Sequence, residues 1–245
     1  MASRLASIFA RLNVENYSEF DKILKRGDGV GEFIQAMTTN KTGFWREPAH
    51  FEFLESNLLA YYQKKSETTH GSNKLRIWCA ASSTGQEIYT LLFILDEIFG
   101  AGLPNIVKVL ATDIDCDALK SASKGVYYEK DLEDLPDHYK TENFRELASD
   151  RLGRRFAVKD KFRDLVTFAQ LNLVEWPYDF SFGFDLIFCR NVLIYFDKVT
   201  VEKVILELSK TLILGGMLFI GHSEMGAKRP SSLETVISAG YKKIG

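Results

Sequence analysis

The sequence predicts an α/β protein whose core is a doubly wound, Rossmann-like parallel sheet. Three observations predict this class: short β-rich apolar runs begin at Leu75, they alternate with stretches of helical periodicity, and polar residues follow directly where several of the runs end. Alternation of this kind is typical of successive βαβ units, in which each helix crosses over the sheet.

The part of the chain before Leu75 has a different pattern. Apolar residues recur three and four positions apart, which is typical of amphipathic helices. A polar stretch at 39–43 predicts a turn between helices, and the Ser/Thr-rich stretch 66–74 predicts a linker. We therefore expect a small helical N-terminal domain over 1–68 and an α/β domain over 69–245.

Within the α/β domain the periodicities predict individual elements. The expected strands are 75–81, 107–113, 165–171, 184–189 and 217–221, and the expected helices are 86–99, 117–123 and 198–212. The charged segment 143–164 contains the alternating stretch RFAVKDKF, which predicts an inserted β hairpin or excursion.

Composition narrows the class of protein. The chain has 245 residues, 46% of them apolar, enough for one sizeable core with a small accessory domain. Its 31 basic and 33 acidic residues nearly cancel, which argues against a nucleic-acid partner. The three cysteines form no C-x-x-C pair, and no apolar stretch has membrane-spanning length. We expect a cytoplasmic protein that binds no metal and does not insert into a membrane.

The loop after the first expected strand, AASSTG, consists of small residues that let a ligand approach the backbone, and Glu87 follows in the first turn of a helix. The loop lacks the G-x-G-x-x-G pattern of dinucleotide-binding proteins, and a carboxylate there would repel a pyrophosphate. A ligand with a positive end, such as S-adenosylmethionine, suits Glu87 better. The alternative is that Glu87 only complements the helix dipole.

The second expected strand ends at Asp113, a position from which a carboxylate can accept both hydroxyls of a ribose. Asp113 therefore favours an adenosine ligand, although it could instead cap the next helix, as Asp115 and Asp117 could. Asn172 and Leu173 end the third strand, where they could frame an adenine.

The fourth strand is followed by Arg190 and Asn191, which bring a fixed cation and an amide to the ligand crevice. The alternative is a turn whose arginine pairs with a nearby acid. Cys189 is expected in the core, and Tyr195 could serve packing alone. None of the four histidines has ligand-like spacing; His222 is expected to be structural, and His50, His70 and His138 to be surface or packing residues.

Five motifs in order resemble the CheR-type chemotaxis receptor methyltransferases over nearly the whole chain. They are TNKTGFWRE from Thr39, ASSTGQE, ATDID, FCRNVLIYFD, and GHSE from Gly221. The resemblance implies a helical N-terminal domain, a methyltransferase sheet with a small inserted antiparallel subdomain, and methyl transfer from S-adenosylmethionine to glutamates. The partner it implies is the cytoplasmic helical domain of chemotaxis receptors.

The resemblance also implies roles for individual residues. Asn40, Thr42 and Arg46 look like contacts to the donor, with Arg46 suited to its carboxylate. Glu87 matches the acid that receives the methionyl amino group, Asp113 the ribose acid, and Asn172 with Leu173 the adenine-side pair. Arg190 and Asn191 match the pair beside the donor, and Tyr195 the tyrosine near the transferred methyl. Tyr195, Arg46 and Arg190 are therefore the expected catalytic residues.

The chain departs from the family pattern in two places. Gln86 stands where the family usually has a first glutamate, so that one charge is missing, and the N-terminus has Arg4 and Arg11 where several arginines are usual. The second departure leaves an alternative open, a donor-binding regulatory module with little or no receptor methylation. A glutamate substrate of pKa about 4.3 is already ionised at neutral pH, so the reaction needs no general base.

Overall fold

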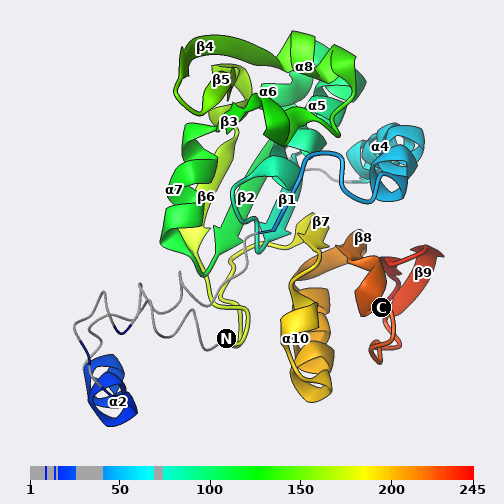
Figure 1. Ribbon diagram of the computed structural model, residues 1–245. Helices are drawn as coiled ribbons and strands as arrows, with labels where there is room; N and C mark the ends of the chain where they lie inside the picture. Colours follow the sequence, from blue (N-terminus) through cyan, green and yellow to red (C-terminus); the bar gives the residue numbers. More distant parts are fainter. Residues whose placement is uncertain (1–8, 10–13, 15, 26–40, 69–73) are drawn as a thin grey trace.

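The computed structural model describes residues 9, 14, 16–25, 41–68 and 74–245 (Figure 1). A seven-stranded sheet forms its centre, in the order β6-β2-β1-β7-β8-β10-β9. Pairing is parallel from β6 to β8, whereas β10 is antiparallel to β8 and β9. The predicted doubly wound sheet is confirmed, with an antiparallel edge. Its strands are β1 (Leu75–Ala80), β2 (Val107–Asp113), β6 (Val166–Gln170), β7 (Phe184–Cys189), β8 (Leu212–Ile220), β9 (Leu233–Ile237) and β10 (Gly240–Lys243).

The strand order reverses at β1. The strands β2 and β6 lie on one side of β1, and β7 and β8 lie on the other. A reversal of this kind leaves a crevice outside the carboxyl ends of the central strands, where α/β proteins bind their ligands.

Helices cover both faces of the sheet. On one face lie α4 (Ala49–Thr68) and α5 (Gln86–Phe99), and on the other lies α10 (Lys198–Thr211). Successive side chains of a strand point to opposite faces, so Ile77 of β1 joins the core with α4 and α5 while Trp78 joins the core with α10. The other described helices are α2 (Tyr17–Lys25), α6 (Leu103–Ile106), α7 (Cys116–Lys124), α8 (Asp137–Asn143) and α9 (Asp160–Arg163), with short 3-10 turns η1 (Gly100–Gly102), η2 (Glu129–Leu132), η3 (Leu193–Tyr195) and η4 (His222–Glu224). No helix in the described segments is long and apolar enough to cross a membrane.

The helix α4 packs directly on the sheet. Its Phe51, Leu54 and Leu58 are fully buried, or nearly so, in the cluster that holds Ile77. The helix continues through Thr68, so the predicted linker begins three residues too early, because its Ser/Thr-rich composition hides the last helical turn. The division into domains at residue 68 stays a prediction.

A separate three-stranded antiparallel sheet follows α7, in the order β3-β5-β4. Its strands are β3 (Val126–Tyr128), β4 (Phe144–Asp150) and β5 (Gly153–Val158). The inserted antiparallel unit is thus present, but it begins before residue 143, and residues 160–163 form α9 instead of strand. A three-residue strand such as β3 is too short to show a period of two in the sequence.

The predicted bounds of α5, β2 and β7 coincide with the observed ones. Those of β1 and α10 differ by one residue at one end, and those of α7 and β6 by one residue at each end. The strand β8 starts five residues earlier than expected, at Leu212, because Gly215 and Gly216 interrupt its apolar pattern. The short, partly exposed strands β9 and β10 were not predicted.

Candidate active site

A cavity of about 360 Å³ lies at the carboxyl ends of β1, β2 and β7. Every predicted site residue that the structure describes lines it. These are Thr42, Arg46, Glu87, Asp113, Asn172, Leu173, Arg190, Asn191 and Tyr195. Asn40 lies outside the described residues, as does His70. The structure therefore brings segments from five parts of the chain to one place, while the role of each residue remains a prediction.

Glu87 lies in the first turn of α5, after Gly85, whose φ of 95° lets the β1 loop turn into the helix. Its Oε2 is 3.0 Å from Nη1 of Arg190, and its Oε1 accepts a hydrogen bond from Sγ of Cys79 at 3.1 Å. Glu87 also lies in the first turn of α5, where a carboxylate complements the helix dipole, so the alternative role expected from the sequence is compatible with its position. The ion pair with Arg190 on the cavity wall shows that the dipole is not the only partner of this carboxylate.

Asp113 is buried at the end of β2, where its carboxylate accepts hydrogen bonds from the backbone N–H of Ser83 at 2.8 Å and of Asp115 at 2.9 Å. Burial raises the pKa of Asp113, although these backbone hydrogen bonds oppose the rise. The cap of α7 is Asp115, which accepts from the N–H groups of Asp117 and Ala118. Capping therefore does not account for Asp113.

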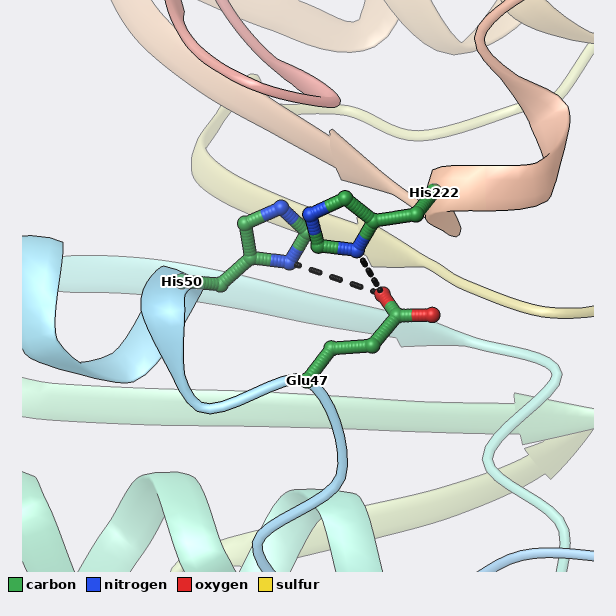
Figure 2. A group of neighbouring side chains, drawn as sticks. All are labelled: Glu47, His50 and His222. Carbon is green, nitrogen blue, oxygen red and sulfur yellow. Dashed lines mark ion pairs between the residues drawn. The ribbon is translucent and has the colours of Figure 1, made fainter.

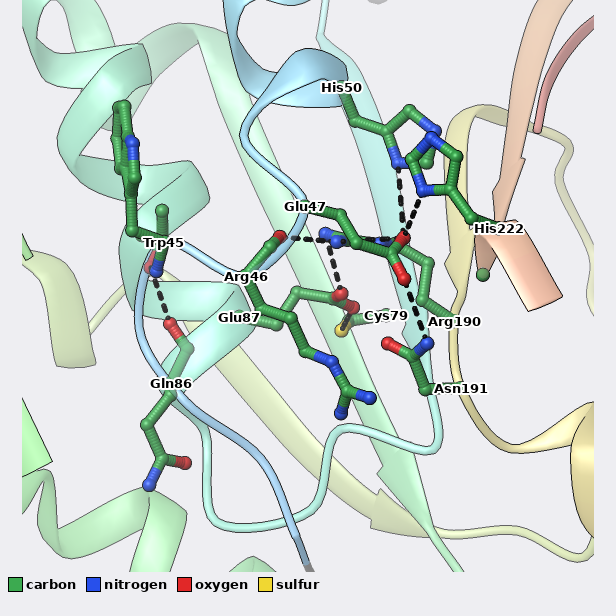
Figure 3. A network of polar contacts seen from close by, with 12 residues as sticks. Trp45, Arg46, Glu47, His50, Cys79, Gln86, Glu87, Arg190, Asn191 and His222 are labelled. Atoms are coloured by element: carbon green, nitrogen blue, oxygen red, sulfur yellow. Dashed lines mark hydrogen bonds and ion pairs between the residues drawn. The ribbon is translucent and has the colours of Figure 1, made fainter. Parts of the chain in front are cut away.

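Arg190 is buried and holds the centre of a polar network (Figure 3). Besides Glu87, it contacts Oε2 of Glu47 at 3.3 Å, donates to the backbone carbonyl of Arg46, and lies over the ring of Phe51. The interpretation of Arg190 as the partner of a nearby acid is thus correct, and so is its place on the cavity wall. Its Nη1 and Nη2 are thus paired with carboxylates, and its buried Nε has no hydrogen-bond acceptor among the described residues.

Asn191 is held in the left-handed region, with φ of 59°, by contacts from two sides. Its Nδ2 donates to Oε1 of Glu47 at 2.9 Å, and its backbone N–H donates to Oε2 of Glu224 at 3.2 Å. Gly221 allows this approach, because a Cβ there would lie 2.6 Å from Asn191 Nδ2 and 2.8 Å from Glu224 Oε2. The glycine and the glutamate of the GHSE motif therefore support the Arg-Asn loop.

The remaining predicted residues lie around the mouth of the cavity. Tyr195 is 59% exposed at the end of η3, so packing alone does not explain it. Arg46 is exposed and donates from Nη1 to the carbonyl of Lys41 at 3.0 Å. The side chain of Asn172 donates a hydrogen bond to Glu175 and accepts one from the backbone N–H of Val174, while Leu173 is buried.

Glu47 is, with Glu224, one of two acids of this polar network that sequence reasoning did not single out. It lies outside the cavity lining, with a left-handed φ of 54°, and its carboxylate meets Arg190, Asn191 and Nδ1 of His222, the last at 3.0 Å. Burial raises the pKa of Glu47, but the Asn191 hydrogen bond, Arg190 and His222 outweigh it and lower the pKa to about 2. Its place in the TNKTGFWRE motif was the available signal.

Glu47, His50 and His222 bring three metal-ligand atoms within 4.8 Å of one another (Figure 2). The two imidazole rings stack with an interplanar angle of 5°, however, and the lone pairs of a ring lie in its plane. Because the two ring planes are parallel and stacked, lone pairs that lie in these planes do not meet at one ion. The cluster therefore has the geometry of an ion-pair network. His50 is fully buried, as expected of a packing residue, and burial lowers its pKa to about 4. His138 is half exposed, and Cys189 lies in the core as predicted.

Comparison with known proteins gives one consistent result. Residues 40–240 match the family model described as CheR methyltransferase, SAM binding domain. The chain is 36% identical to the chemotaxis protein methyltransferase of Borreliella burgdorferi, across 98% of this chain and 84% of that protein. It is 37% identical to a probable chemotaxis protein methyltransferase of Rhizobium etli, across 91% and 82% of the two chains. It is 38% identical to chemotaxis protein methyltransferase 2 of Pseudomonas aeruginosa, across 91% and 76%.

Proposed function

The chain belongs to the CheR methyltransferase family, and on that premise we propose that it transfers methyl groups from S-adenosylmethionine to glutamate carboxylates of chemotaxis receptors. The observation that carries this proposal is the meeting of Glu87, Asp113 and Arg190 at one cavity at the reversal of strand order. The partner is the cytoplasmic helical domain of a receptor, which presents acidic side chains.

The residues of the cavity fit the donor chemically. Asp113 would accept the ribose hydroxyls, and Asn172 with Leu173 would frame the adenine. Glu87 would receive the methionyl ammonium, while the donor carboxylate would meet the exposed Arg46, with Arg190 beside it on the cavity wall. Thr42, Asn191 and Asn40 complete the set of residues proposed to contact the donor.

The donor contributes an electrophilic methyl on a sulfonium, so the protein has only to position and desolvate the reactants. The substrate carboxylate is ionised at neutral pH and needs no base. Tyr195, exposed at the mouth of the cavity, would guide that carboxylate toward the methyl. Arg46 and Arg190 would hold the methionyl end of the donor, so that methyl and carboxylate stay in line.

The test is incubation with methyl-labelled S-adenosylmethionine and receptor cytoplasmic fragments from the same cell. Base-labile label on glutamate is the expected result, since glutamate methyl esters hydrolyse in base. Tight donor binding with no transfer to any of these receptors would contradict the proposal and favour a donor-binding regulatory module of the same fold.

A further inference from the structure

The wall of the cavity carries more positive than negative side chains. The lining includes three basic side chains, Lys41, Arg46 and Arg190. It includes two acidic ones, Glu87 and Asp113. S-adenosylmethionine itself has a net charge of +1, from a sulfonium and an ammonium against one carboxylate. The wall alone would therefore disfavour the donor that the site is proposed to bind.

Glu47, which lies outside the cavity lining, supplies an additional negative charge next to Arg190. Glu47 does not line the cavity, yet its Oε2 lies 3.3 Å from Nη2 of Arg190. Arg190 thus faces two carboxylates, Glu87 on Nη1 at 3.0 Å and Glu47 on Nη2. Without Glu47, Glu87 would be the only acid paired with the guanidinium. Arg190 would then neutralise the charge of Glu87, which would no longer attract a ligand ammonium.

We propose that Glu47 is a positioning residue that neutralises Arg190, and thereby leaves Glu87 free to receive the ammonium of the donor. The three groups together carry one net negative charge, which matches the net positive charge of the donor. This inference rests on the proposed donor site.

The surroundings of Glu47 fix its carboxylate in this role. Oε1 accepts from Asn191 at 2.9 Å, so the carboxylate cannot rotate away from Arg190 without losing that hydrogen bond. His222 contacts Oε2 at 3.0 Å, and its ring stacks on the buried ring of His50. The low pKa of Glu47 keeps it ionised throughout the neutral range.

The test compares three ligands by calorimetry on the wild-type protein and on Glu47→Gln, which keeps the size of the side chain and removes its charge. S-adenosylmethionine and S-adenosylhomocysteine share the ammonium and carboxylate of the amino-acid end, and only the first has the sulfonium. Methylthioadenosine has no amino-acid end. We expect Glu47→Gln to weaken binding of both S-adenosyl compounds, which share the ammonium, about tenfold, and binding of methylthioadenosine by under about twofold. Glu47→Asp, which keeps the charge, should recover part of the loss.

Glu52→Gln is the matched control, since it removes one exposed carboxylate from the first turns of α4, close to Glu47 in the chain, and it should bind all three ligands as the wild type does. An equal loss for all three ligands in Glu47→Gln would overturn the inference, because it would indicate general disruption of the site. Unchanged binding of all three would overturn it as well. A wild-type protein that binds neither S-adenosyl compound would instead refute the donor site, and the role of Glu47 with it.

Discussion

Asn191 rests on the buried carboxylate of Glu224, which accepts its backbone N–H at 3.2 Å. The same carboxylate accepts the N–H groups of Gly221 at 2.6 Å, Leu193 at 2.7 Å and Ile194 at 3.3 Å. One side chain after β8 therefore fixes the loop after β7 that presents Asn191 and Tyr195 to the cavity. One acid therefore ties together the loops that follow two neighbouring parallel strands, β7 and β8.

Replacing Glu224 by Ala should destabilise the protein strongly. It leaves four backbone N–H groups without their acceptor, and an unsatisfied buried donor costs about 1–3 kcal/mol. We expect a loss of about 3 kcal/mol or more in the free energy of unfolding, measured by urea titration. Glu234→Ala, which removes an exposed carboxylate on β9, is the control and should change stability by under about 0.5 kcal/mol. Similar values for both variants would contradict the supporting role of Glu224.

Glu87→Ala and Asp113→Ala should each weaken binding of S-adenosylmethionine at least about tenfold, or roughly 1.4 kcal/mol. The first removes the partner proposed for the ammonium, and the second removes the acceptor proposed for the ribose hydroxyls. Calorimetric titration measures both. Wild-type affinity in either variant would refute the role assigned to that residue.

Donor affinity should fall as the pH is lowered from 7 toward 4.5. Burial raises the pKa of Asp113, and the ribose hydroxyls are proposed to donate to its ionised form. Protonation therefore competes with binding, and because the pKa is raised the competition begins at a higher pH than for an exposed aspartate. Asp113→Asn cannot titrate, so the difference between the two pH profiles isolates this group. If donor affinity changes with pH in the same way for the wild type and for Asp113→Asn, protonation of Asp113 does not compete with donor binding.

The sequence was sufficient for the parts of the fold that have a regular period. The strands β2 and β7 are mostly apolar and each is followed by polar residues, and α5 has clear helical periodicity, so their ends were predicted to the residue. The short strands β3, β9 and β10 were missed because three to five residues, partly exposed, show no period.

The candidate site was predicted where polar residues follow strand ends, as with Glu87, Asp113 and Arg190. Glu47 and Glu224 were missed for a physical reason. Neither lines the cavity at the end of a predicted strand, and each acts on Asn191 over more than thirty positions of the chain. A pattern local in sequence cannot show a contact of this kind, which depends on how the loops meet after folding.

Tyr195→Phe should separate catalysis from donor binding and from stability. The side chain is 59% exposed, so loss of its hydroxyl should change the free energy of unfolding by under about 0.5 kcal/mol. The proposed role is to guide the substrate carboxylate, and we therefore expect the rate of methyl transfer to fall about tenfold or more while the Kd for S-adenosylmethionine stays within about twofold. Transfer assays at saturating donor, with calorimetry on the same preparations, measure both quantities. A change in donor affinity equal to the change in rate would indicate that Tyr195 acts in donor binding instead. An unchanged rate would show that its hydroxyl takes no part in methyl transfer.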